Sequence, residues 1–278
     1  MRVVSRIGFY FLKAKNFLYF EITIKDRVSL FYNHLLNEIN ANIQFVATKE
    51  VNLCMTYVIS LTFRSDRRII IENQFYKTKL SFNFVDAEFF NNSKSNLNYF
   101  STKSLRCLSH GSLGCALSHI KLWEKIASLE ADSYHLIFED DVIFDRNFQN
   151  TLDQLLETYP IDADIFFLGT RNERPRDILF FTQFNYCRSF NCRLGAFAYI
   201  ISSKSAEKIL SAITPLNLIC GGIDTALGVA IRRKKLIAYQ MNKSIVLHNN
   251  EFTSNIYNPS SPKKKLHHLT LNSWRSNL

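Results

Sequence analysis

Short apolar runs alternate with helical patterns along most of this sequence, and the alternation limits the folds that the chain can adopt. Runs rich in β-branched and aromatic residues are typical of buried strands. Between these runs, residues 111–130 show the clearest helical pattern, with apolar residues every three or four positions, as in an amphipathic helix. The expected strands cover residues 57–62, 80–87, 135–140, 163–169, 194–202, 236–240 and 244–248, and the expected helices cover residues 65–77, 111–130, 147–158 and 203–213. This order predicts an α/β domain with a mostly parallel central sheet.

Two local features complete this prediction. Ser65 is expected to cap the first helix, because Ser is a favoured residue at that position. The stretch between residues 88 and 103 is rich in Asn and Ser, and we expect a loop there.

The two ends of the chain differ from its middle. Residues 1–54 contain seven basic and four acidic residues and no clear strand–helix unit. They are either a true N-terminal extension, or Met55 is the natural start of the protein. Residues 55–250 are expected to form the main domain. Residues 251–278 form a basic tail with no acidic residue after Glu251.

Composition sets the broad class of protein. With 278 residues, 47% of them hydrophobic, the chain can bury a sizeable core. Its net charge of +10 favours anionic partners such as nucleic acid, an anionic membrane surface or phosphate-bearing molecules. A nucleic-acid-binding protein should gather basic residues on one face with exposed aromatics. Here the basic residues are dispersed, so we expect no nucleic-acid partner.

The cysteines and apolar segments predict a cytoplasmic protein. None of the six cysteines forms a CxxC pair, and a chain of this length needs no disulfides, so we expect free thiols and no zinc site. No apolar run approaches the roughly 20 residues that span a bilayer. The N-terminal apolar stretch, residues 7–12, is too short for a signal peptide. The lysines near residue 264 belong either to a solvated, partly disordered tail or to a segment that makes weak peripheral contact with anionic lipid at the inner face of the cytoplasmic membrane.

Three consecutive acids interrupt an apolar segment. Glu139, Asp140 and Asp141 follow Ile137 and Phe138 at the carboxyl end of an expected strand, where α/β sheets bind their ligands. Side chains alternate along an extended segment, so positions 139 and 141 should point one way and position 140 the other. Two carboxylates on one side could hold Mn²⁺ or Mg²⁺. The alternative is a strand that ends in a solvated turn.

Five sequence blocks resemble a known family when they are taken in order. They are "VISLTFRSDRR", "GSLGCALSHIKLW", "LIFEDDV", "GAFAYIISSKSA" and "GGID", which begin at residues 58, 111, 136, 195 and 221. The set is similar to glycosyltransferase family 25, the lipooligosaccharide galactosyltransferases and their relatives. The resemblance implies a GT-A-like nucleotide-sugar-binding domain, a divalent cation and inverting sugar transfer. UDP-galactose is the expected donor, and a lipooligosaccharide or lipopolysaccharide is the expected acceptor.

The same resemblance implies roles for individual residues. The expected metal ligands are Glu139, Asp141 and His248. The expected contacts to the nucleotide-sugar are Ser60, Arg67, Arg68, Ser118, His119 and Asp140. The expected catalytic residues are Asp224 and Asp141, with Asp224 taking the proton from the acceptor hydroxyl.

Several of these assignments have plainer alternatives. Ser118 and His119 lie within an apolar helix and could be polar groups satisfied inside the core. Asp224 could cap a helix that starts near residue 225, and the two arginines could be solvated. At the level of the whole chain, the alternatives are a degenerate family member that serves as a non-catalytic partner, and a basic nucleic-acid-binding protein.

Overall fold

The computed structural model describes residues 46–129, 132–170, 180–181, 184–189 and 195–249. All of them lie in the second of two compact units, residues 43–278. The predicted N-terminal extension up to residue 45 and the basic tail 251–278 lie outside the described residues. Within the described residues, no helix combines the length and the apolar character that crossing a membrane requires.

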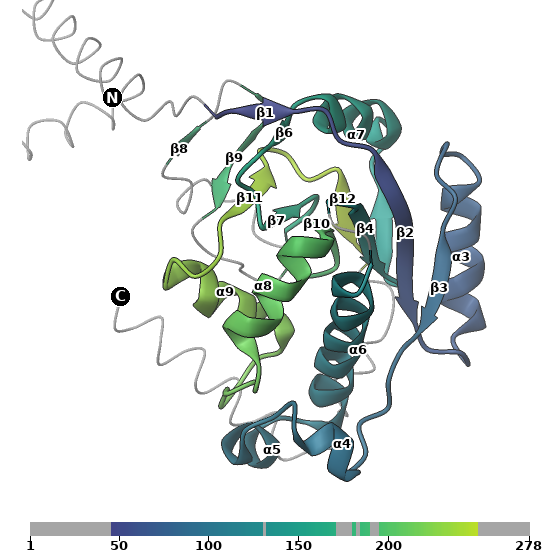
Figure 1. The fold of residues 1–278 in the computed structure, drawn as a ribbon. Coiled ribbons are helices and arrows are strands. Elements are labelled where there is room, and N and C mark those ends of the chain that lie inside the picture. Colours follow the sequence, from purple (N-terminus) through teal and green to yellow (C-terminus); the bar gives the residue numbers. More distant parts are fainter. Residues whose placement is uncertain (1–45, 130–131, 171–179, 182–183, 190–194, 250–278) are drawn as a thin grey trace, which may run out of the picture. The chain divides into compact units, whose positions relative to one another are not determined.

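A central sheet of eight strands organises the described residues (Figure 1). In spatial order the strands are β3 (Asn83–Asp86), β2 (Leu53–Ser60), β4 (Tyr134–Glu139), β10 (Ala198–Ser202), β7 (Ile165–Phe167), β11 (Ala238–Met241), β9 (Tyr186–Ser189) and β8 (Phe180–Phe181). The pairings β2–β3, β2–β4 and β7–β11 are parallel, and the other four are antiparallel. Strands β10 and β9 therefore run against the other six. The predicted α/β class is confirmed, and the sheet is mixed.

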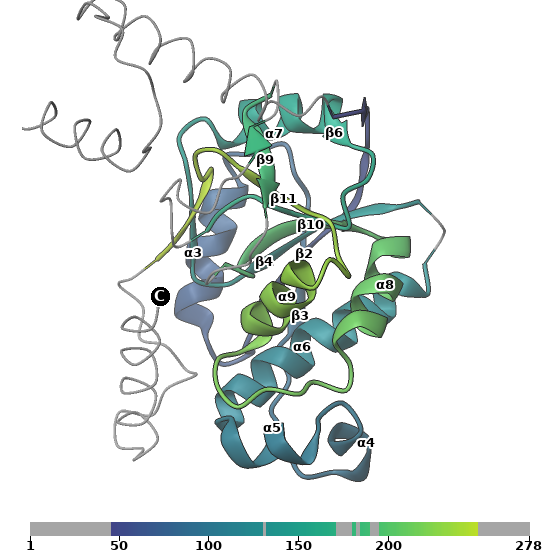
Figure 2. The ribbon, with the colours of Figure 1, turned by 90° about the vertical axis from the view of Figure 1, so that its left-hand side faces the viewer.

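Helices cover both faces of this sheet (Figures 1 and 2). The helices of the described residues are α3 (Ser65–Phe75), α4 (Lys94–Leu97), α5 (Thr102–Cys107), α6 (His110–Ala127), α7 (Phe148–Glu157), α8 (Ser203–Ile213) and α9 (Ile223–Arg232). The short helices α4 and α5 lie at one end of α6 and not over the sheet (Figures 1 and 2). Side chains alternate along each strand, which separates two cores. Ile59 and Ile137 pack toward α6, α8 and α9. Val58 and Phe138 pack toward α3 and α7. The arrangement is consistent with the GT-A-like fold that the family resemblance implies.

Two small two-stranded sheets are separate from the main sheet. Strand β1 (Thr48–Lys49) pairs with β6 (Tyr159–Pro160), and β5 (Val142–Phe144) pairs with β12 (Val246–His248). In the second of these sheets, His248 lies opposite Val142, directly after the acidic triplet. A residue near the end of the described chain is thereby brought beside residues about a hundred positions earlier.

The structure corrects three local predictions. Ser65 is the first residue of α3; the capping position belongs to Arg64, whose side chain makes no capping hydrogen bond. The predicted loop at residues 88–103 contains α4 and the start of α5. The predicted boundary before residue 55 falls inside β2, and the fold already includes β1. Val51 is buried in the core on the α3 and α7 side of the sheet.

The described cysteines at positions 54, 107, 115, 187 and 220 are free thiols. The prediction for Cys192 lies outside the described residues.

Candidate functional site

The candidate site lies where β2 and β4 end side by side. These strands are parallel neighbours, and Ile59 pairs with Glu139, so their carboxyl ends meet at one edge of the sheet. The turn after β4 carries Asp140 and Asp141, and it leads into β5, which pairs with β12. This edge is where an open α/β sheet binds its ligands.

Asp140 is the most deeply enclosed of the three acids. Its side chain is only 8% exposed, and one oxygen accepts a 2.6 Å hydrogen bond from Nη1 of Arg67. Its other oxygen accepts a 2.8 Å bond from the hydroxyl of Ser60. Arg67 is itself buried. The sequence predicted that Ser60, Arg67 and Asp140 contact the nucleotide-sugar, whereas here they bind one another, as a buried ion pair with a supporting hydroxyl.

Arg68 lies at the edge of this cluster. Its Nη2 donates to the Ser60 carbonyl oxygen at 3.1 Å and to Oδ1 of Asp86 at 2.6 Å. Its side chain is 22% exposed, and that of Asp86 is 67% exposed. The side chain of Arg68 is therefore partly exposed and paired with Asp86. It links the end of β2 to the end of β3.

Asp141 and His248 form a second pair at this edge. Oδ2 of Asp141 lies 3.4 Å from Nε2 of His248 and 3.4 Å from Nη1 of Arg67. The backbone N–H of Asn249 donates to the Asp141 carbonyl oxygen at 2.7 Å. The sequence resemblance brought His248 and Asp141 into one predicted site, and the structure places them together.

Glu139 contacts side chains of α6. Its Oε1 lies 3.2 Å from Nε2 of His119. Nδ1 of the same imidazole lies 2.7 Å from the hydroxyl of Tyr199, which accepts a 2.9 Å bond from the Trp123 indole N–H. His119, Trp123 and Tyr199 are fully buried. This chain of contacts fixes the side chain of Glu139 from within the core.

The three acids differ in their side-chain partners. Strand β4 ends at Glu139, and the next two residues form a bend. A bend does not alternate its side chains as a strand does. Asp140 and Asp141 consequently both reach Arg67, and Glu139 alone contacts His119.

Nearby negative charge acts on Glu139. Burial raises the pKa of its carboxyl group above the usual value, and the charges of Asp141 and Asp224 raise it further, while the hydrogen bond with His119 opposes the rise. Burial and the same three carboxylates also raise the pKa of the Cys115 thiol well above its usual value. The three carboxylates therefore share one electrostatic environment, and their negative charge would favour the binding of a cation.

Asp224 lies in the first turn of α9. The helix is capped by Gly222, not by Asp224, and Asp224 accepts a 2.8 Å hydrogen bond from the backbone N–H of Thr225. The preceding Gly221 has a φ of +83°, and a Cβ there would lie 2.0 Å from the Thr225 hydroxyl oxygen. Only glycine fits this turn, so the GGID block sets the entry into α9 that holds Asp224.

Ser118 is not part of this cluster. Its hydroxyl donates to the Gly114 carbonyl oxygen and accepts from the Glu88 backbone N–H, both at 2.8 Å. Ser118 therefore joins helix α6 to the segment after β3. The core alternative that the sequence left open describes its contacts.

Sequence reasoning missed two residues beside the site. Cys115 Sγ lies 3.8 Å from Oε1 of Glu139. The signal was its position, four residues before His119 on one helix. Arg64 follows β2, and its guanidinium pKa is raised by the hydrogen bond to Asp66 and by the charges of Asp140 and Asp141, although burial opposes the rise. Nothing in its local sequence distinguishes it from a solvated loop arginine.

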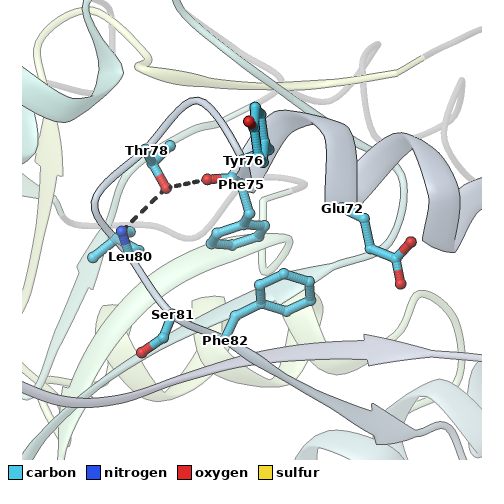
Figure 3. Close-up of a pocket in the computed structure, with 7 residues that line it drawn as sticks. All are labelled: Glu72, Phe75, Tyr76, Thr78, Leu80, Ser81 and Phe82. Atoms are coloured by element: carbon cyan, nitrogen blue, oxygen red, sulfur yellow. Dashed lines mark hydrogen bonds between the residues drawn. The ribbon is translucent and has the colours of Figure 1, made fainter.

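A hollow on another part of the fold lies at the C-terminal end of α3 (Figure 3). Phe75 and Phe82 stack there with ring centroids 4.2 Å apart. The Thr78 hydroxyl donates to the Phe75 carbonyl oxygen and accepts from the Leu80 N–H. These contacts close a turn. Among the residues that line the hollow, the ionisable side chains are Glu72 and the phenol of Tyr76.

The residues at the edge of the sheet suit a divalent cation. Carboxylate oxygens and an imidazole are ligands that Mn²⁺ accepts, and carboxylates also suit Mg²⁺. Glu139, Asp141 and His248 provide these groups, and their side chains are 26%, 14% and 14% exposed. Asp140 is unsuited to direct coordination, because both its oxygens already accept short hydrogen bonds.

Comparison with known proteins gives relatives of one kind. A human protein named inactive glycosyltransferase 25 family member 3 is 33% identical over 132 residues, which are 43% of this chain and 22% of that protein. Procollagen galactosyltransferase 1-A of Xenopus laevis is 26% identical over 178 residues, 56% of this chain and 28% of that protein. A Haemophilus influenzae protein named as a glycosyltransferase is 32% identical over 172 residues, which are 56% of this chain and 57% of that protein. The chain thus spans less than two-thirds of each relative.

Among solved structures, a glycosyltransferase involved in the glycosylation of the major capsid of PBCV-1 aligns with 78% of this chain and 99% of its own. The TM-score is 0.38 and the identity is 7%, too low to support an argument.

The family comparison is more specific. The model of glycosyltransferase family 25 (LPS biosynthesis protein) matches residues 54–226. That range includes the ends of β2 and β4, the helix that carries His119, and Asp224, and it stops before His248. Because the match covers more than half of the sequence, this chain belongs to glycosyltransferase family 25.

Proposed function

We propose that this protein is an inverting, metal-dependent glycosyltransferase that moves galactose from UDP-galactose onto a lipooligosaccharide or lipopolysaccharide acceptor. One observation carries the proposal. The ends of β2 and β4 bring Glu139 and Asp141 to one edge of the sheet, where Oδ2 of Asp141 lies 3.4 Å from Nε2 of His248 and the charges of Asp141 and Asp224 raise the pKa of Glu139. Family membership supplies the reaction class.

The residues around the acidic triplet would hold the cation. Glu139, Asp141 and His248 are the proposed ligands for Mn²⁺ or Mg²⁺. When bound, the cation would neutralise the negative charge of the leaving diphosphate. The buried pair of Arg67 and Asp140, with Ser60, keeps the neighbouring turn in place.

Asp224 is the proposed base. In an inverting transfer the acceptor hydroxyl oxygen bonds to the anomeric carbon, while the bond from that carbon to the diphosphate oxygen breaks. The bonding electrons leave with UDP, and the hydroxyl proton passes to the Asp224 carboxylate. The backbone N–H of Thr225 donates to Asp224, which fixes the direction of the carboxylate.

The other polar residues around the acidic triplet have different proposed roles. Among the described residues, Arg68 and Arg64 lie at the edge of the site and are the proposed contacts to the donor phosphates. His119 acts by holding Glu139. Ser118 has no proposed contact with the donor, since its hydroxyl joins α6 to Glu88.

The family description and the composition of the tail bear on the acceptor and on the location of the protein. The family description refers to LPS biosynthesis, and the name of the Xenopus relative refers to galactose transfer onto procollagen. We propose a lipid-linked saccharide acceptor and a cytoplasmic location at the inner face of the membrane. The basic composition of the tail favours that surface.

A non-catalytic role is the second candidate. It is favoured by the human relative, which is named as an inactive member of the family. A protein of this type would retain the fold and could bind a partner or a nucleotide-sugar without turnover.

A donor screen separates the two candidates. The full chain is incubated with UDP-galactose, UDP-glucose, UDP-N-acetylglucosamine or GDP-mannose, and release of the nucleoside diphosphate is measured with Mn²⁺, with Mg²⁺ or with EDTA. The proposal predicts release from UDP-galactose that requires the cation, with GDP-mannose as the negative control. Binding of UDP-galactose without release would support the non-catalytic role, and release that is equal in EDTA would contradict the metal assignment.

A further inference from the structure

A second kind of metal-binding group lies beside the acidic triplet, on the α6 side. Cys115, His119 and Glu139 each point a ligand atom into the same small volume, and these atoms all lie within 4.8 Å of one another. The two helix residues are four positions apart, which puts them on one face of α6. Glu139 closes the group from the end of β4.

The distances fit a tetrahedral ion. Zn–S bonds of about 2.3 Å and Zn–N bonds of about 2.0–2.1 Å place tetrahedral ligand atoms roughly 3.3–3.8 Å apart. The imidazole Nε2 lies 3.2 Å from Oε1 of Glu139, and the Cys115 sulfur lies 3.8 Å from the same oxygen. Two of the three separations therefore already match, and the third, from the Cys115 sulfur to Nε2 of His119, is at most 4.8 Å and needs to shorten by roughly 1.5 Å at most.

The imidazole is already oriented as a metal ligand. Its Nδ1 contacts the hydroxyl of Tyr199 at 2.7 Å, and that hydroxyl is held by the indole N–H of Trp123. A metal-binding histidine nearly always uses its other ring nitrogen for a hydrogen bond of this kind, which fixes the ring. Without metal, Nε2–H can donate to Glu139; a bound ion would take the Nε2 lone pair, and the ring proton would then lie on Nδ1, where the Tyr199 hydroxyl can accept it.

Charge and access also suit a bound ion. Cys115 and Glu139 are both partly exposed, so an ion can enter from their side and keep a water as its fourth ligand. A thiolate and a carboxylate together carry two negative charges, which balance a divalent cation. On binding, the Cys115 thiol releases its proton to solvent as the sulfur–metal bond forms.

We propose that Cys115, His119 and Glu139 form a binding site for a thiophilic divalent cation, with Zn²⁺ as the fitting ion. Thiolate and imidazole select zinc or cobalt over Mn²⁺ and Mg²⁺, so this site is chemically distinct from the oxygen-rich one. The two share Glu139. If the proposed function holds, zinc would compete for that carboxylate and inhibit the transferase; this consequence rests on the proposed function, whereas the site itself does not.

Cobalt provides a direct test, because a thiolate bound to Co²⁺ gives a charge-transfer absorption in the near ultraviolet. Metal-free full-length protein is titrated with Co²⁺, and Zn²⁺ is then added to displace it. We expect a band that saturates at one equivalent and is lost on adding zinc. Cys115→Ser should remove the band, and Cys107→Ser and Cys220→Ser, both at exposed thiols, should leave it. No band in the unaltered protein, or an unchanged band in Cys115→Ser, would overturn the site.

Two further measurements guard against a variant that simply unfolds. In the unaltered protein, Zn²⁺ should slow alkylation of Cys115 by iodoacetamide at least tenfold, read by peptide mass spectrometry, with Cys107 as the internal control. Equal alkylation with and without zinc would contradict the proposal. Tyr199→Phe should weaken zinc binding by about 10–100-fold. If that variant binds zinc with unchanged affinity, the proposed orientation of His119 is wrong.

Zinc inhibition is measured separately from binding. If UDP-galactose turnover is found, zinc should inhibit Cys115→Ser at least tenfold less than the unaltered protein, relative to each protein's own rate. A chain that binds cobalt through Cys115 but turns over no donor would contradict the proposed function and leave the zinc site standing.

Discussion

The Asp140 carboxylate is held by side chains from two different elements. Arg67 comes from the first turns of α3, and Ser60 is the last residue of β2. Neither contact could be inferred from spacing, because Asp140 is separated from them by 73 and 80 positions. A buried charge of this kind requires its partner, since an unpaired charge loses its water without compensation.

Replacing Arg67 should therefore be strongly destabilising. Arg67→Met leaves Asp140 buried without its cation, and we expect the free energy of unfolding to fall by about 3–5 kcal/mol. Urea denaturation followed by circular dichroism measures this loss. Lys79→Met is the matched control: Lys79 pairs with Asp153 at 3.7 Å on the surface and is 81% exposed, so its loss should be below about 1 kcal/mol. Equal losses would show that the buried pair contributes little.

Glu139 should make stability depend on pH. Burial, with Asp141 and Asp224, raises its folded pKa above the ordinary value of 4.5. The folded state then binds the proton more tightly than the unfolded state does. The contribution of Glu139 to stability is therefore fully present below the unfolded pKa and declines as pH rises toward the folded pKa.

The variant Glu139→Gln isolates this effect. Because Gln does not ionise, the stability of the variant relative to the unaltered protein should increase between about pH 4 and pH 7. Denaturation is measured with a chelator present, so that bound metal does not contribute. A difference that stays constant across this range would contradict the raised pKa.

Several site residues could be predicted from sequence because they follow recognisable patterns. Glu139 and Asp141 end an apolar strand, and His119 belongs to a clear amphipathic helix. The directions of the side chains could not be predicted, since the bend at Asp140 and Asp141 replaces strand geometry. Tyr199 is buried, and nothing in the sequence indicated that its hydroxyl lies between His119 and Trp123.

At the scale of elements, α6 approaches the chain after β3 more closely than an ordinary helix does. A Cβ at Gly114 would lie 2.6 Å from the Glu88 carbonyl oxygen. Ser118, one turn later, accepts a hydrogen bond from the Glu88 N–H. The helix that carries His119 is thereby fixed at a short distance from the end of β3.

A single methyl group tests this contact. In an exposed helix Gly→Ala would stabilise by about 0.8–1.0 kcal/mol. Here we expect Gly114→Ala to destabilise by about 1–3 kcal/mol, because the neighbouring atom is backbone and moves little. Thermal and urea unfolding measure the sign. Gly111→Ala, in the first turn of the same helix, is the matched substitution and should not show this loss. A stabilised Gly114→Ala variant would contradict the close approach.

The strong periodicity of α6 made that helix predictable, but the short helices α4 and α5 were missed. Each has a serine at its capping position: Ser93 and Ser101 accept hydrogen bonds from the backbone N–H groups of Asn96 and Ser104. The capping signal was present in the sequence. Helices of four and six residues are too short for periodicity to support it.

At the scale of the whole molecule, the domain begins earlier than the sequence pattern indicated. Val51 is 5% exposed, and its N–H donates to the Leu156 carbonyl oxygen at 2.9 Å. Two-residue strands such as β1 carry too little pattern to be recognised, and their pairing with β6 depends on contacts over more than a hundred positions. The position of β10 between β4 and β7, antiparallel to both, also depends on contacts between distant residues and could not be predicted from the sequence pattern.

If residues before Met55 belong to the fold, trimming Val51 should weaken it. Val51→Ala should lower the free energy of unfolding by about 1–3 kcal/mol, from lost burial and the small cavity that remains. Glu50→Ala, at the exposed neighbouring residue, should change it by less than about 0.5 kcal/mol. Denaturation of the full chain measures both. An unaffected Val51→Ala variant would favour Met55 as the start of the structural domain.

The central claim is that the acids at the end of β4 support sugar transfer, and Asp141→Ala tests it most directly. Arg67 keeps its bond to Asp140 in this variant, so the fold should survive, as an unchanged unfolding transition would verify. With Mn²⁺, the unaltered protein should release UDP from UDP-galactose, and Asp141→Ala should be at least about 100-fold slower, since it loses a group that supports charge stabilisation. Turnover by a folded Asp141→Ala variant at the unaltered rate would contradict the account.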